Sequence, residues 1–419
     1  MMPGILVVLV VALTATACST SGASSPSSSV GGNSIGITAS TVTVGQVDTL
    51  TGPVPGLFEG AENGTLAYFD YVNSQGGVNG RKIKLDVKDD TFSGATYVTD
   101  TQQLVSSDFA LVGGFSLFDD AGVPAINAAK IPDITESLSQ ARGTDVYNYA
   151  PDPLIVGGAA LGPLTYYKEK FPSAIKHVGT LFSNVATAEV QSEAELNAMK
   201  SIGYEVGYQR ITGPLESNFI PDVLKMRAAG VQMVFIVGLA VTQVADLAQQ
   251  MKQENFTPQV FATNGVAYDS SYIPAAGAAA NGTYTALQTP LFLGQDAATV
   301  PAVMLLDKWV KKVSPSAHID LYALYGWSSG ELFVQALQAA GKNPTRTTLI
   351  SALNKITLFN ASGLLAPGNP AQKKPEQCWI LATVSGGKWA RTAPSPKSGF
   401  VCNPGGYYYP SGFKPFTRP

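Results

Sequence analysis

Strand patterns and helix patterns alternate along most of this chain, and this alternation restricts the fold more than any single motif does. Residues 41–50 alternate β-branched and polar side chains, residues 61–73 carry apolar residues at helical spacing, and residues 82–90 alternate again. A helix between two such strands forms a crossover, which places the strands parallel in one sheet. The sequence therefore predicts an α/β protein built on parallel sheets.

The alternation divides into two series. The first series adds a helix at 95–107, a buried strand at 109–115 and a helix at 121–131. The second series begins with a helix at 154–171 and continues with strands at 177–184, 205–211, 232–238 and 259–264, helices between them at 188–203, 219–230 and 242–255, and later helices at 302–313 and 322–341. A chain of 419 residues exceeds the ~250–300 residues at which a single core stops growing, so two α/β units in tandem are expected.

The first residues resemble the export signal of a bacterial lipoprotein. The apolar run 5–17 is shorter than the ~20 residues of a membrane span but has the length of a signal-peptide core. It ends in small residues directly before Cys18, as in a lipobox, although Ala15 stands where leucine is usual and no Lys or Arg precedes the run. We expect a lipoprotein signal peptide at 1–18 with acylation of Cys18; an ordinary cleaved signal peptide is the alternative.

The sequence after Cys18 predicts a flexible tether and then a folded domain that contains a disulfide. Residues 19–39 are mostly Ser, Gly, Pro and other small residues, which cannot bury a core and behave as a flexible linker. An exported chain folds under oxidising conditions, so the two remaining cysteines, Cys378 and Cys402, are expected to form a disulfide. Two unrelated buried thiols are the alternative.

The glycine run NSQGGVNGRKI at 73–83 raises the question of a phosphate-binding loop. Such a loop follows a strand and opens a helix, because the N-terminal N–H groups of the helix hold the phosphate. Here the order is reversed, since the run ends a predicted helix and precedes a predicted strand. Gly76 and Gly77 are therefore predicted to cap the helix in a left-handed conformation, and Gly80 to form the turn into the strand.

The sequence contains no complete motif for catalysis or for metal binding, because the required residues stand in the wrong order or are too few. The segment GWSSG around Ser328 matches the nucleophile elbow of α/β-hydrolases, but His177 and His318 both precede it, whereas the hydrolase histidine follows its serine. The surrounding residues also form one amphipathic helical pattern. Two distant histidines without a C-x-x-C or H-E-x-x-H motif indicate no metal site, and neither a catalytic residue nor a cofactor is expected.

Charged residues are sparse, and they point to no polyanionic partner. The net charge of −3 provides no basic face for nucleic acid. Two pairs of adjacent carboxylates, 89–90 and 119–120, are expected to be solvated loop residues, because neighbours in a strand face opposite ways and cannot form an acid–base couple. The loops are therefore interpreted as binding surfaces.

Several motifs together resemble the leucine/isoleucine/valine-type periplasmic binding proteins, the substrate-binding subunits of ABC importers. In the first half these motifs are VGQVDTLTGP at 44–53, NG at 63–64, the glycine run at 73–83, DVKDD at 86–90 and LVSSDFALVGGF at 104–115. In the second half they are SNFIPDVLKMRAAGVQMVFIVG at 217–238 and LYGWSSGELFVQALQAAG at 324–341. The resemblance covers residues 41–355.

This resemblance implies a type I periplasmic-binding-protein fold, with two doubly wound parallel-sheet lobes joined by a three-segment hinge. Lobe 1 is expected at 40–154 and 287–354 and lobe 2 at 155–286 and 355–419, with hinge crossings near 152–156, 285–290 and 353–360. The implied protein is not an enzyme: it is extracytoplasmic and lipid-anchored, captures a small solute by lobe closure and delivers it to an ABC permease and ATPase. A sensing module of a receptor or signalling system is the alternative.

The ligand-binding positions of the family map onto few residues of the first lobe. Leu57 and Phe58 stand where an aromatic residue usually precedes glycine, and Ser116 matches the serine that holds the ligand carboxylate. Ser137 and Ser139 lie in the next loop, which contributes a hydroxyl and backbone groups. Hydroxyls and loop N–H groups suit a carboxylate or another small acceptor.

The second lobe departs further from the family. Asn264 replaces the acid that pairs with the ligand ammonium, and an unpaired buried ammonium costs several kcal/mol. Ordinary α-amino acids are therefore disfavoured unless Glu136 or Glu189 substitutes for that acid. The expected ligand is an amino acid, an amide or a small carboxylate.

Overall fold

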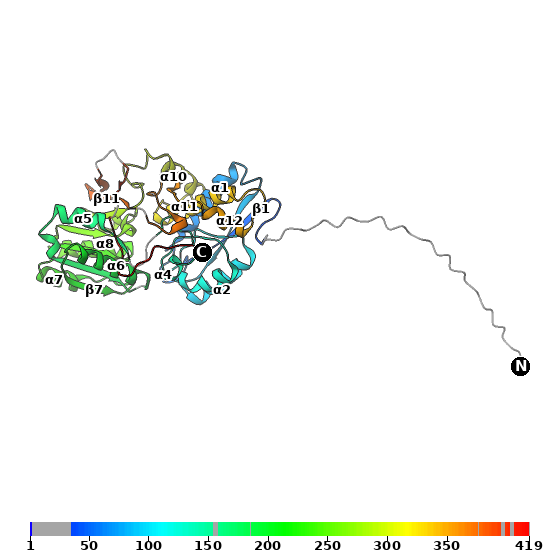
Figure 1. Ribbon diagram of the computed structural model, residues 1–419. Coiled ribbons are helices and arrows are strands. Elements are labelled where there is room, and N and C mark those ends of the chain that lie inside the picture. Colours follow the sequence, from blue (N-terminus) through cyan, green and yellow to red (C-terminus); the bar gives the residue numbers. More distant parts are fainter. Residues whose placement is uncertain are drawn as a thin grey trace. The chain divides into compact units, whose positions relative to one another are not determined.

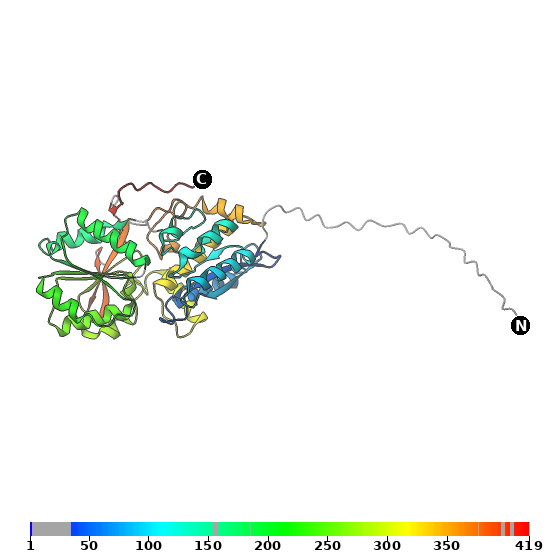
Figure 2. The same cartoon turned by 90° about the horizontal axis from the view of Figure 1, so that it is seen from below.

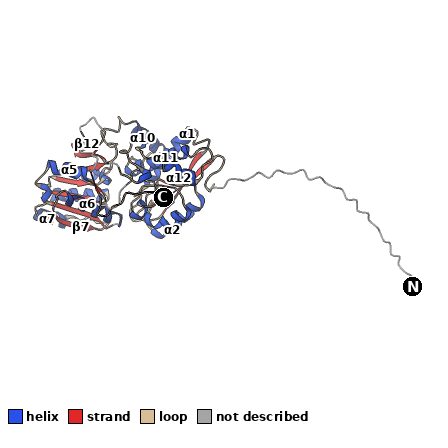
Figure 3. Cartoon of the chain, in the orientation of Figure 1, coloured by secondary structure: helices blue, strands red, loops and turns tan. Residues whose placement is uncertain are grey.

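The computed structural model describes residues 35–153, 158–184, 186–375, 377–394, 399–402 and 406–418, together with Met1. The predicted signal peptide, Cys18 and most of the predicted tether lie outside these described residues. The described chain is an α/β structure in which helices and strands alternate, as Figures 1 and 3 show. Its strands fall into two main sheets.

The first sheet is parallel and comes from the N-terminal part of the chain. Its strands, in spatial order, are β2 (Lys82–Asp89), β1 (Thr41–Asp48), β3 (Leu111–Val112) and β4 (Asp133–Ile134). The helices between them are α1 (Glu59–Ser74), α2 (Gly94–Ser107) and α3 (Val123–Ala129), followed by the short α4 (Gln140–Gly143). Val42 and Val44 pack on the α1 side of this sheet, whereas Val47, an odd number of residues away, packs on the α2 side.

The second sheet is mixed. Its spatial order is β12 (Lys388–Ala393), β11 (Cys378–Ser385), β10 (Thr283–Leu287), β9 (Val260–Thr263), β8 (Met233–Val237), β6 (Val178–Ser183) and β7 (Val206–Thr212), with β13 (Val401–Cys402) also paired to β11. The strands from β7 to β10 are parallel, and β11, β12 and β13 pair antiparallel.

Helices cover both faces of the second sheet, as Figure 2 shows. These helices are α5 (Leu161–Lys170), α6 (Ala186–Ser201), α7 (Ile220–Ala228), α8 (Val241–Gln253) and the short α9 (Tyr272–Ala276). Met233 and Phe235 of β8 pack with α5 and α6, whereas Val234 and Ile236 pack with α7 and α8. A strand buried on both faces in this way reads as a continuous apolar run, as β8 does.

Three later helices return to the first sheet, namely α10 (Pro301–Val313), α11 (Leu321–Ala339) and α12 (Arg346–Leu353). Helix α11 lies directly against α1, and the two backbones approach closely because glycines stand at the crossing. A Cβ on Gly64 would lie 1.9 Å from the Ala323 carbonyl oxygen, and a Cβ on Gly326 would lie 2.2 Å from that of Ala61. Ser328 lies within α11 and donates to the Leu324 carbonyl, so GWSSG forms helix, as predicted, and not a nucleophile elbow.

The glycine run takes the predicted form. Gly76, Gly77 and Gly80 all have positive φ angles, of 105°, 79° and 81°. The Gly77 N–H donates to the Val72 carbonyl at the end of α1, which satisfies a helix C-terminal acceptor. The run is therefore a helix cap and a turn into β2.

The C-terminal segment is tied to several parts of the chain. Cys378 and Cys402 form the predicted disulfide. A third, two-stranded sheet pairs β14 (Tyr407–Tyr408) with β5 (Ala159–Ala160). Near the end, Arg418 stacks on the Tyr149 ring at 3.6 Å and donates to the carbonyl oxygens of Asn148 (2.7 Å) and Ala371 (2.7 Å).

Most predicted elements are confirmed within two or three residues, but two differ. The buried strand expected at 109–115 is only the two-residue β3. The helix expected at 154–171 begins at Leu161, after β5, and residues 154–157 lie outside the described residues. Strand β5 forms because Ala159 and Ala160 pair with β14, about 250 residues away, and local periodicity cannot reveal such pairing.

Short 3₁₀ turns complete the chain, at Asp119–Gly122, Ala174–Lys176, Gly265–Ala267, Gly277–Ala280, Ala361–Gly363 and Pro370–Gln372. Among the described residues, every helix is too short or too polar to cross a bilayer. The lobe boundaries given above remain a prediction.

The α1–α11 crossing generates a stability prediction. We expect Gly64→Ala to lower the free energy of unfolding by about 1–3 kcal/mol, because the new methyl group overlaps the Ala323 carbonyl and pushes the helices apart. Gly207→Ala in β7, where a Cβ meets nothing within 4 Å, is the matched control and should be neutral or slightly stabilising. Denaturant unfolding of both variants measures the difference, and equal stability of the two would contradict the close approach.

Candidate functional site

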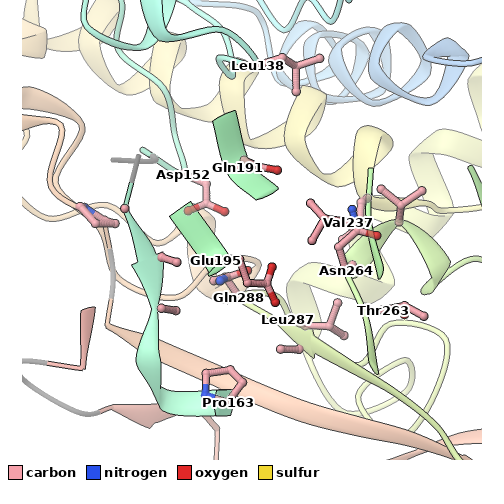
Figure 4. Close-up of a pocket in the computed structure, with 18 of the residues that line it drawn as sticks. Leu138, Asp152, Pro163, Gln191, Glu195, Val237, Thr263, Asn264, Leu287 and Gln288 are labelled. Atoms are coloured by element: carbon pink, nitrogen blue, oxygen red, sulfur yellow. The ribbon is translucent and has the colours of Figure 1, made fainter. Parts of the chain in front are cut away.

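A cavity of about 360 Å³ opens where strands of both sheets end. Its lining comes from the last residues of β8, β9 and β10, from the segments after β3, β4, β9 and β10, and from α5, α6 and the start of α11. Figure 4 shows Leu138 at one end of the lining residues and Pro163 at the other, with Asp152 and Glu195 between them. The carboxyl ends of parallel strands are the general location of ligand sites in open α/β sheets.

A buried ion pair holds the loop that follows β4 against the first sheet. The Arg142 guanidinium donates to both carboxylate oxygens of Asp133, at 2.9 and 2.8 Å, and both side chains are almost fully buried. Asp133 also accepts from the Thr135 hydroxyl (2.7 Å) and the Asn148 amide (3.0 Å). The pair therefore fixes both the cavity loop 135–139 and the segment around Asn148.

Two further buried carboxylates hold the loop that follows β3. Asp48 accepts from the Phe115 N–H at 2.6 Å, and Phe115 lines the cavity. Asp90 accepts from the hydroxyls of Thr49 and Ser116. Burial raises the pKa of Asp48 well above its usual value and that of Asp90 also. Both acids order the backbone and do not face the cavity.

These positions correct the expectation of solvated carboxylates. Asp120 is exposed as expected, but Asp90 and Asp119 are buried. Asp119 accepts from the N–H groups of Leu138 (2.8 Å) and Ser139 (3.2 Å), so it braces the cavity loop from behind. A short loop at a strand end needs acceptors for its N–H groups, and these acids provide them.

The second-sheet wall of the cavity is apolar. Phe235, Ala262 and Ala286 lie on three adjacent strands and face the layer of α5 and α6. Leu164 and Tyr167 of α5 form the opposite side. The two alanines leave room on this face of the sheet where larger side chains would fill the space.

Acidic side chains line the cavity both near the first sheet and near the second. Near the first sheet, Glu136 is 7% exposed and accepts a hydrogen bond from the Asp152 N–H at 2.9 Å. The Asp152 carboxylate lies next to Glu136 and accepts a hydrogen bond from the Tyr325 hydroxyl at 3.3 Å. Burial and the neighbouring Asp152 charge raise the pKa of Glu136 well above its usual value.

Glu195 lies on the second-sheet side, on α6. It forms no hydrogen bond or ion pair within the described part of the chain, and burial raises its pKa to about 7. Ala188, Ser192 and Met199 of the same helix are buried, so Glu195 lies on the inward face of α6, at spacings of 7, 3 and 4 residues from them. The sequence signal that could have identified Glu195 is an acidic residue on the face of a helix whose other residues are predicted to be buried.

The predicted ligand-binding residues divide into two groups. Ser137, Ser139 and Asn264 line the cavity. The structure places Leu57 and Phe58 behind the lining, where they pack with Phe115.

Ser116 also lies behind the lining. It is buried, donates to Asp90 and accepts from the Phe118 N–H at 3.0 Å. Of the two substitutes considered for the missing acid, Glu136 lines the cavity, whereas Glu189 is exposed outside it.

Within the described residues, His, Cys, Asp and Glu form no group of three that could hold a metal ion. The lining offers hydroxyls, amides, carboxylates and apolar surface. This set of groups can bind a solute but contains no arranged nucleophile and base.

Glu195 generates a pH-dependent stability prediction. Its carboxyl group has an ordinary pKa of 4.5 and a folded pKa of about 7, so the folded chain binds more protons between these values and stability falls as pH rises through that range. Without ligand, Glu195→Gln should raise the free energy of unfolding by about 1–3 kcal/mol at pH 8 and change it little at pH 4.5. Denaturant unfolding across this range measures the effect; a difference that does not vary with pH would refute it.

Comparisons with known proteins agree with this geometry. A family model described as periplasmic binding protein matches residues 41–388. An amino acid binding protein of Pseudomonas aeruginosa is 26% identical over 289 residues, which cover 65% of this chain and 71% of that protein.

Two solved structures show the same fold. A fatty acid ABC transporter substrate-binding protein from Thermomonospora curvata has a TM-score of 0.75 and 20% identity. The match covers 88% of this chain and 94% of the Thermomonospora chain. A branched chain amino acid ABC transporter protein from Thermus thermophilus with bound valine has a TM-score of 0.74 and 16% identity. The match covers 87% of this chain and 97% of the Thermus chain.

The family match extends over the first sheet, over the second sheet apart from most of β12 and all of β13, and over the helices that cover them. The two-sheet α/β architecture is that of the solved relatives. Proteins of this family bind solutes outside the cytoplasm and are not enzymes. The chain belongs to the periplasmic binding protein family.

Proposed function

We propose that this protein is the solute-binding subunit of a branched-chain amino-acid-type ABC importer, anchored to the outer face of the membrane by a lipid on Cys18. The observation that carries the proposal is the cavity of about 360 Å³ whose walls come from strand ends of both sheets. A solute bound there touches both halves of the molecule at once. Its binding energy therefore favours the closed arrangement over the open one.

The course of the chain supports capture by lobe closure. Residues 145–153 lead from the first sheet toward the second, residues 288–300 lead back to α10, and residues 354–377 lead from α12 to β11. These passages overlap the proposed hinge crossings at residues 152–153, 288–290 and 354–360, which supports the proposal. A few residues in each passage can absorb the rotation, and the permease then distinguishes the closed, loaded form.

The character of the lining supports a small solute with an apolar body. Phe235, Val237, Leu287 and Leu164 offer apolar contact, while Ser139 and Asn264 offer polar groups. The relatives named above are described as binding an amino acid, a fatty acid and valine, all of which combine a polar group with an apolar part. We propose Ser137, Ser139 and Asn264 as residues that contact the solute.

A solute screen tests the binding function. Thermal-shift measurements on the purified protein with amino acids, amides, carboxylates and amines should identify a solute that raises the melting temperature saturably, because a ligand at 100 times its Kd adds about 2.7 kcal/mol of stability. Asn264→Ala should weaken that solute about 5- to 30-fold through the loss of one polar contact. Asn281→Ala, at an exposed site outside the cavity, is the control. No saturable shift with any solute would refute the binding function.

The anchor has its own test. Cys18→Ser removes the sulfur that would carry the lipid, so the variant should move from the membrane fraction to the soluble extracytoplasmic fraction of expressing cells. Labelling with a fatty-acid analogue should mark the unchanged protein and not the variant. Equal membrane association of both proteins would instead favour an ordinary signal peptide with another mode of attachment.

A further inference from the structure

We propose that the solute carries a positively charged amino group on an apolar body and that this amino group pairs with the Glu195 carboxylate. The inference rests on the proposed solute-binding function and specifies the chemical class of the ligand. It makes a free carboxylate group on the ligand unfavourable. Four features of the cavity support it.

The first feature is the sign of the charges in the lining. Glu136, Asp152 and Glu195 all line the cavity, and among the described lining residues there is no Lys, Arg or His. Buried charges require a partner of opposite sign or must lose their charge. An anionic solute would add another acidic group to this lining, whereas a cationic solute compensates the Glu195 carboxylate.

The second feature is that the loop groups suited to a ligand carboxylate are already engaged. The N–H groups of Leu138 and Ser139 donate to Asp119, and the Phe115 N–H donates to Asp48.

The hydroxyls of Ser116 and Ser137 are engaged as well. The Ser116 hydroxyl donates to Asp90, and the Ser137 hydroxyl donates to the Asn148 side-chain oxygen at 3.1 Å. Buried acids occupy the Phe115, Leu138 and Ser139 N–H groups and the Ser116 hydroxyl, and the Asn148 amide occupies the Ser137 hydroxyl. A ligand carboxylate would have to compete with these acceptors, which are covalently held in place.

The third feature is a pair of acceptors in the cavity that lack donors. Glu195 forms no hydrogen bond or ion pair within the described chain, and the side-chain oxygen of Asn264 is buried without a hydrogen-bond partner. An ammonium group brings three N–H donors and no acceptor. It therefore supplies what these two side chains lack.

The fourth feature is the cost of Glu195 to the empty protein. Burial raises the pKa of Glu195, so the charged form of its carboxyl group is unfavourable in the empty cavity. A bound cation removes this penalty, so the free energy stored in the empty site strengthens ligand binding. The apolar wall of Leu164, Phe235 and Ala286 accommodates the rest of the solute.

A matched series of solutes tests the proposal. Hexylamine, hexanamide and hexanoate share a six-carbon body and differ in the charge of the head group; leucine adds a zwitterion. Binding of each is measured by thermal shift and calorimetry at pH 8 with the full protein, with Glu195→Gln and with Glu193→Gln. Glu193 lies two residues away on α6 and is exposed, so it controls for net charge.

We expect the amine to bind most tightly and Glu195→Gln to weaken it about 10- to 100-fold, the effect of losing one charge-assisted hydrogen bond, while Glu193→Gln leaves it unchanged. Tighter binding of hexanoate or leucine than of the amine overturns the inference but leaves the solute-binding function intact. Equal amine affinity of Glu195→Gln and Glu193→Gln overturns it as well. Binding of none of the four solutes, when the wider screen also yields none, overturns both.

Discussion

The buried pair of Asp133 and Arg142 is the interaction on which the ligand cavity most depends. Arg142 donates twice to Asp133, and Asp133 also accepts from Thr135 and Asn148, so one carboxylate joins the end of β4, the cavity loop and the passage toward the second sheet. Removing one partner of such a pair costs about 3–5 kcal/mol, because the other charge remains buried. This cost makes a single loop geometry far more favourable than its alternatives.

The same principle recurs with Asp48, Asp90 and Asp119. Each is buried and accepts hydrogen bonds from a loop that follows a strand, so the first-sheet side of the cavity is preorganised before any ligand arrives. In relatives with an amino acid in the cleft, loops of this kind are expected to offer donors to the ligand. Here the N–H groups of Phe115, Leu138 and Ser139 donate to the protein's own acids, and the lining includes the carboxylates of Glu136, Asp152 and Glu195.

The fold could be predicted from the sequence because periodicity reports which faces are buried. Strand β8 reads as a continuous apolar run and the glycine run follows the pattern of a helix, a cap and a strand, and both are confirmed.

The ligand site was less predictable from the sequence. Burial of Asp90 depends on contacts with Thr49 and Ser116 far along the chain, and the exposure of Glu195 to a cavity depends on how α6 meets the sheet. Such long-range contacts leave little trace in the local pattern.

The disulfide also restrains a segment that contributes to the cavity wall. It joins β13 to β11. A few residues further along the chain, β14 pairs with β5, and Tyr407 of β14 and Ala160 of β5 line the cavity together. Closing a loop of 24 residues contributes about 3 kcal/mol in the chain-entropy account. In a reducing compartment this contribution is absent, and the wall that Tyr407 forms is less firmly held. The stability of the cavity wall thus depends on the redox state of a bond between two residues that do not themselves line the cavity.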